Sequence, residues 1–132
     1  MKTNDFFYAD THAEFLNNVF GTNYKQWMKS VWKYGIDTIV WMVRFDKETR
    51  DGWRNSFINE NELLEENLIL TRKKYDGTPL QKHLGLRRIV IAIDESGYRR
   101  KYIFKGVFVL NEERENTNLK HYFVKISDEI EG

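Results

Sequence analysis

The feature of this sequence that most constrains its fold is a pair of apolar, β-branched runs between residues 87 and 110. The first run covers residues 87–93 and the second begins at Tyr98, and the residues between them, 94–97, are all turn formers. Two such runs around a short turn are typical of a β-hairpin. The sequence therefore predicts that residues 87–94 and 98–110 pair antiparallel in the middle of a sheet.

The second run alternates between ring-bearing and basic residues, as expected for a strand whose side chains point to opposite faces in turn. One face would carry Tyr98, Tyr102, Phe104, Phe108 and Leu110, and the other Arg99, Lys101 and Lys105. Gly106 lies in the middle of this strand, where glycine is typical of a sharp bend. A bend at this position predicts a sheet that curls into a barrel-like shape.

The rest of the chain predicts a single α+β domain over residues 1–132, with two N-terminal helices and a curved, mostly antiparallel five-stranded sheet. Thr11 and Glu14 form a capping box for the first helix, which Gly21 ends. Apolar residues at helical spacing predict the second helix over residues 23–34. Further strands are expected at residues 36–45, 53–58 and 119–127, whereas Leu63, Leu64 and Leu68 beside a glutamate-rich face suit a helix within residues 59–70.

Composition excludes several kinds of chemistry. Cysteine is absent, which excludes disulfides, thiol catalysis and cysteine metal sites and fits a cytoplasmic protein. No apolar run is long enough to span a membrane, and the polar N-terminus does not resemble a secretory signal. No motif predicts a catalytic residue, a metal ligand or a cofactor, although a metal-dependent nuclease site built from Asp46, Asp51 and Glu60 is an alternative that no spacing favours.

The charges are distributed unevenly along the chain. The net charge is +1, but residues 72–105 hold ten Lys and Arg against three Asp and Glu, whereas residues 46–66 hold three against seven. Such clustering can create a basic patch that attracts phosphates. The alternative is an ordinary solvated face.

Rings interleaved with cations are the remaining chemical signal, since stacking surfaces beside positive charges suit single-stranded or flipped nucleotides. The alternative for the rings is the core of a small domain. The candidate nucleic-acid-binding residues are Trp41, Trp53, Asn55, Arg72, Lys73, Lys74, Arg87, Arg88, Tyr98, Arg99, Lys101 and Tyr102.

Several segments resemble the paired strands of PUA-like and SRA-like β-barrel domains found in bacterial modification-dependent nucleases and defence-associated proteins. The resemblance covers residues 22–126. The segments that carry it are Arg88-Ile89-Val90, Tyr102-Ile103-Phe104-Lys105-Gly106-Val107-Phe108, Gly52-Trp53-Arg54-Asn55, and residues 24–32, which precede a strand that contains a tryptophan. It implies a partial barrel that binds RNA or holds an extruded, modified DNA base in an aromatic pocket without catalysing a reaction. It also implies a looser, partly extended segment at residues 59–70.

The function expected from the sequence is thus a non-catalytic nucleic-acid-binding module, a reader of a modified or flipped base, with a nuclease or other protein as partner. One alternative is a protein-interaction or regulatory domain on the same scaffold that has no nucleic-acid ligand. A third is a small phage or defence-system enzyme.

Overall fold

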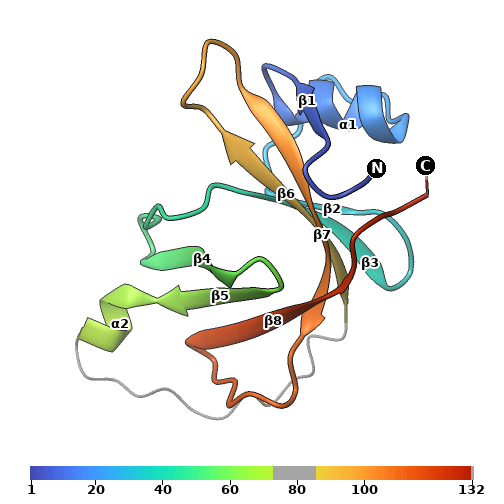
Figure 1. Ribbon diagram of the computed structural model, residues 1–132. Helices are drawn as coiled ribbons and strands as arrows, with labels where there is room; N and C mark the ends of the chain where they lie inside the picture. Colours follow the sequence, from blue (N-terminus) through green and yellow to red (C-terminus); the bar gives the residue numbers. More distant parts are fainter. Residues whose placement is uncertain (73–85, 132) are drawn as a thin grey trace.

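The computed structural model describes residues 1–72 and 86–131, which contain eight strands and two helices (Figure 1). In chain order they are β1 (Phe6–Tyr8), α1 (His12–Phe20), β2 (Val31–Lys33), β3 (Thr38–Val43), β4 (Trp53–Asn59), β5 (Glu62–Asn67), α2 (Leu68–Arg72), β6 (Arg87–Asp94), β7 (Lys101–Leu110) and β8 (Lys120–Ser127).

All eight strands belong to one open sheet. Its order is β2-β3-β6-β7-β8-β5-β4, and β1 pairs with β7 beside this path. Only β3 and β6 run parallel among the paired strands that the structure describes. The α+β class and the curved, mostly antiparallel partial barrel are therefore confirmed, with eight strands where the sequence predicted five.

The central hairpin is confirmed, and Gly106 lies at its bend. β6 and β7 pair antiparallel from Arg88↔Phe108 to Asp94↔Lys101, and the register shifts between Val90 and Ile91. Gly106 opposes Val90 and has a backbone φ of +119°, a conformation that other residues rarely adopt. One extra residue in β7 therefore forms a β-bulge at this point.

The bulge makes the predicted faces of the second run wrong. Tyr102 and Phe104 pack on one side of the sheet together with Val107, whereas Phe108 and Leu110 pack on the other side. An extra residue in a strand moves every later side chain to the opposite face, so simple alternation fails beyond Gly106.

Each face of the central strands has its own apolar core. On one face, α1 contributes Phe15 and Leu16 to a cluster with side chains of β3, β6 and β7. On the other face, side chains from β3, β5, β6, β7 and β8 meet in a second cluster. Three strands lie between β3 and β5 in the sheet order. The sheet must curl to bring these strands together, and Figure 1 shows β4, β5 and β8 turned away from the β6–β7 hairpin, which has β1 and α1 beside it.

The first predicted helix is confirmed and the second is wrong. Thr11 caps α1 by accepting from the backbone N–H of Glu14, and Gly21 ends it in the left-handed conformation. Residues 22–30 form no helix, because the Asn17 side chain bonds both the N–H and the carbonyl of Tyr24. Trp27 packs against the core from this extended stretch. Here tertiary contacts override a helical pattern.

The extended alternative for residues 59–70 is confirmed. β5 occupies Glu62–Asn67, and the short helix α2 follows it directly. Asn67 is buried; its side chain donates to the carbonyl of Asp51 and accepts from the N–H of Leu70. This side chain fixes the position at which the strand changes into the helix.

Candidate nucleic-acid interface

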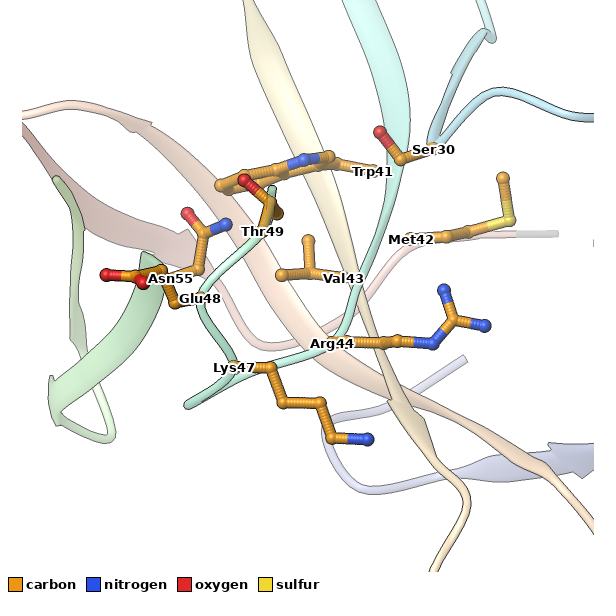
Figure 2. Close-up of a pocket in the computed structure, with 9 residues that line it drawn as sticks. All are labelled: Ser30, Trp41, Met42, Val43, Arg44, Lys47, Glu48, Thr49 and Asn55. Carbon is orange, nitrogen blue, oxygen red and sulfur yellow. The ribbon is translucent and has the colours of Figure 1, made fainter. Parts of the chain in front are cut away.

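A cavity of about 320 Å³ lies at the seam between β3 and β4, toward the two ends of the open sheet. The connecting loop is held against β4 because the N–H of Asp46 donates to Asn55 and the N–H of Thr49 donates to Trp53. We call this cavity the seam pocket (Figure 2); it is lined by Ser30, Trp41, Met42, Val43, Arg44, Lys47, Glu48, Thr49 and Asn55.

Trp41 and Asn55 give the seam pocket an aromatic wall and an unsatisfied polar group. The Trp41 side chain is only 5% exposed and packs in the second core. The Asn55 carbonyl oxygen, Oδ1, is buried and has no hydrogen-bond partner. Buried polar atoms are normally paired, because burial without a partner costs about 1–3 kcal/mol. An acceptor left free in a pocket is typical of a site that completes its bonding with a ligand.

Arg88 places a positive charge behind the Trp41 ring. Its guanidinium carbon lies 4.8 Å from the Trp41 ring centre and 4.6 Å from that of Phe123. Burial lowers the pKa of Arg88, and the charge of Glu65 works in the opposite direction. An arginine stays protonated in proteins, and its Nε has no hydrogen-bond partner here. The Arg88 guanidinium therefore lies over both the Trp41 ring and the Phe123 ring.

A polar cluster joins β4, β5 and β8 on the same face of the sheet. Asn55 pairs with Glu65 across β4 and β5, and Glu65 pairs with His121 across β5 and β8. The His121 Nδ1 and Glu65 Oε1 atoms are 2.8 Å apart. The Trp53 ring is stacked on the His121 ring with centres 5.6 Å apart. These contacts give the partly buried Trp53 a fixed orientation near the start of β4.

A second group of predicted residues lies on the β6–β7 hairpin, away from the seam pocket. Tyr98 is fully exposed at the turn. Arg99 pairs with Asp10 at 3.4 Å and with Glu14 at 3.1 Å. Lys101 belongs to β7 and lies over the rings of two exposed residues of β1. The structure thus divides the candidate residues between two places.

The other candidates belong to neither group. Tyr102 is completely buried and stacks on Phe15 with ring centres 4.5 Å apart, so it is a core residue. Arg87 is exposed at the start of β6. The side chain of Arg72, and Lys73 and Lys74 altogether, lie outside the described residues.

A family model of the SRA domain, the SET and RING associated domain, matches residues 1–131. The chain belongs to the SRA family. This agrees with the SRA-like resemblance predicted from the sequence.

Among solved structures, the SRA domain resembles the chain described as "The 5-Hydroxymethylcytosine-Specific Restriction Enzyme AbaSI". The TM-score is 0.67 at 21% sequence identity, and the match covers 96% of this chain and 40% of that one. No curated protein sequence matches. At this identity the likeness shows a shared fold, and this chain spans less than half the length of the enzyme.

Sequence reasoning missed the polar residues that line the seam pocket besides Asn55, and it missed Glu65 and His121 next to Asn55; the lining residues are Ser30, Arg44, Lys47, Glu48 and Thr49. The positions of Glu65 and His121 follow from the pairing of β4, β5 and β8, which places Asn55, Glu65 and His121 side by side. The alternation of apolar and polar residues in residues 119–127 was visible in the sequence, but the register was not. Only the register brings His121 next to Glu65.

Neither a cluster of metal-ligating side chains nor a membrane-spanning helix is found in the described part of the SRA domain. Within residues 1–72 and 86–131, no three histidine or carboxylate side chains lie close enough together to hold a metal ion. No helix in the same residues is long and apolar enough to cross a membrane.

Replacing Trp53 by alanine should lower the free energy of unfolding of the SRA domain, but by less than the ~3–5 kcal/mol typical of a fully buried tryptophan. The ring is only partly buried, and the substitution removes its stacking on the His121 ring. Chemical denaturation of the variant and the parent measures the difference. A loss as large as that of a fully buried ring would make Trp53 a core residue and remove it from the interface.

The stability of the SRA domain should fall as the pH drops below about 6.5 because of His12. Its Nδ1 lies 2.7 Å from the Tyr102 hydroxyl, which also accepts from Arg100 and so has its proton free to donate. Burial, followed by the charges of Arg44 and Arg100, lowers the pKa of His12. A histidine whose pKa is lower in the folded protein binds a proton less readily there than in the unfolded chain. Its stabilisation is therefore complete above the unfolded pKa and is lost as the pH falls toward the folded one.

The measurement is the free energy of unfolding between about pH 7.5 and 5.5, where most carboxylates stay ionised. His12→Asn should flatten this dependence relative to the parent. Parallel pH profiles for the two proteins would show that His12 does not contribute.

Proposed function

We propose that this SRA domain binds DNA and reads a modified base that is held in the seam pocket. The observation that carries the proposal is the buried, unpaired Asn55 Oδ1 beside the Trp41 wall of a cavity of about 320 Å³. Membership of the SRA family supports it, as does the fold shared with a restriction enzyme described as specific for 5-hydroxymethylcytosine. That description favours DNA over RNA as the ligand.

The residues around the seam pocket suit an extruded base. Trp41 is 5% exposed and lines one wall of the pocket, so it would shape the space for a base rather than offer it a full stacking face. Asn55 Oδ1 can accept a hydrogen bond from an exocyclic amino group of the base, which would satisfy an acceptor that is otherwise unpaired. Arg44 and Lys47 line the same pocket as exposed side chains, where they can meet the phosphates that flank the base.

The domain supplies recognition in this proposal, and a nuclease supplies cleavage. The AbaSI chain is a restriction enzyme, and this chain corresponds to only 40% of its length. We assign cleavage to the part of such an enzyme that this chain does not match.

Asn55→Ala tests the proposed role of Asn55. Because Oδ1 has no partner in the protein, the substitution should leave the free energy of unfolding nearly unchanged. It should weaken binding to a duplex containing one 5-hydroxymethylcytosine by about 5- to 150-fold, the effect of losing a good base contact. Fluorescence anisotropy with a labelled duplex measures this affinity.

Asn23→Ala is the matched control, because Asn23 is exposed and lies outside the seam pocket. It should bind the duplex as the parent does. A normal affinity in Asn55→Ala would contradict the assignment of Asn55 to the base. A marked loss of stability in Asn55→Ala would show that the amide serves the fold instead.

A further inference from the structure

A second cavity, of about 400 Å³, lies between the β6–β7 hairpin and β1. It is lined by Tyr8, Gly97, Tyr98, Arg99 and Lys101, and we call it the tyrosine cleft. Tyr98 is fully exposed and Tyr8 is 46% exposed, although soluble domains generally cover rings of this size. The cleft combines two accessible tyrosine rings with two cationic side chains.

The tyrosine cleft opens on the same face of the sheet as the Trp41 side of the seam pocket. Tyr8 pairs with Lys101, and Lys101 pairs with Asp94, so these side chains project to one face. Two residues before Asp94, Ala92 pairs with Val43, which lines the seam pocket. Side chains two residues apart in a strand share a face. The cleft and the pocket therefore lie on the same face of the sheet.

The cations in the tyrosine cleft are available to an anionic ligand. The Lys101 ammonium lies 5.7 Å from the Tyr8 ring centre and 4.8 Å from that of Phe6, and no ion pair involving it is found among the described residues. Arg99 is paired with Asp10 and Glu14, but it is 43% exposed in both pairs. Exposed ion pairs contribute little stability and exchange readily for another anion.

We propose that the tyrosine cleft binds an unpaired nucleotide of single-stranded nucleic acid. The base stacks on the tyrosine rings, and its phosphates meet Lys101 and Arg99. A volume of about 400 Å³ falls within the range of small-molecule sites. Stacking rings beside cations are the usual means of holding single strands without sequence preference. This activity goes beyond the reading of a base in the seam pocket and does not depend on it.

Anisotropy with a fluorescein-labelled oligothymidine tests the proposal in the whole chain. The parent should bind the oligomer, and Tyr98→Ala should weaken binding by about 5- to 150-fold, as expected for one lost stacking contact. Tyr98 is fully exposed, so its removal should not affect folding. Lys101→Met should lower the slope of log affinity against log salt by about 0.7, the contribution of one phosphate on a single strand.

Two controls match these variants. Ile36→Ala removes a side chain that is 95% exposed, and Lys29→Met removes an exposed cation, both outside the cleft. Each should bind oligothymidine as the parent does. Asn55→Ala should also bind it normally, so this experiment fails or succeeds independently of the seam pocket.

Absence of oligothymidine binding by the parent would overturn the proposal, as would equal binding by the parent and Tyr98→Ala. In that case the exposed rings would be assigned to a protein partner.

Discussion

Replacing Trp41 by alanine should lower the free energy of unfolding by about 3–5 kcal/mol. The ring is 5% exposed and lies with its centre 5.7 Å from that of Phe123, so its removal leaves a cavity in the second core. It also uncovers one side of the Arg88 guanidinium, which lies over the Trp41 ring. Urea denaturation of the variant and the parent measures the loss.

Trp41→Phe is the matched control, because phenylalanine keeps an aromatic ring in the core. It should retain much of the stability that Trp41→Ala loses. If Trp41→Ala lost less than about 1 kcal/mol, the ring would not be part of a packed core. Its placement between the core and the seam pocket would then be wrong.

Replacing Gly106 by valine should lower the free energy of unfolding by about 1–3 kcal/mol or more. The backbone φ of +119° strains any residue with a Cβ. A Cβ at this position would also lie 2.9 Å from Lys125 Cε and 3.0 Å from the carbonyl oxygen of Ser127. Both effects act at the bulge that directs β7 from one core to the other.

Gly35→Val is the control for Gly106→Val, because a Cβ at Gly35 meets no atom within 4 Å and its φ is not positive. Its thermal midpoint should stay closer to that of the parent. Equal midpoints for Gly106→Val and the parent would show that the bend does not need glycine.

The central hairpin was predictable because its signals are local. Turn formers between two β-branched runs specify the pairing of β6 with β7, and a glycine inside a strand indicates the bend. The side on which each ring lies was not predictable, since the position of the bulge follows from tertiary packing. The assignment of Phe108 to the face of Tyr102 was wrong for this reason.

The short strands and the wrongly predicted helix show a second limit of prediction from sequence. β1 and β2 have three residues each, too few for a periodic pattern, and they exist because β7 and β3 offer free edges. The apolar spacing from residue 24 onward suits a helix, but the Asn17 side chain holds the backbone of Tyr24 instead. Contacts with residues outside each segment decided its structure.

The types of residue in the candidate site were predictable, but which of these residues lie together in the structure was not. Rings beside cations indicated Trp41, Asn55 and Arg88, and the structure places Trp41 in contact with Arg88 and in one pocket with Asn55. The same signal also selected Tyr102, which is wholly buried. Aromatic residues serve cores and binding sites alike, and only burial separates the two.

The most direct test of the central claim compares the affinity of the parent for two DNA duplexes that differ at a single cytosine. One duplex carries 5-hydroxymethylcytosine at that position and the other carries cytosine. Competition anisotropy at one salt concentration removes the shared contribution of the phosphates. Reading of a modified base in the seam pocket predicts tighter binding to the modified duplex, by roughly tenfold, the equivalent of about 1.4 kcal/mol. Equal affinity for the two duplexes would contradict the account.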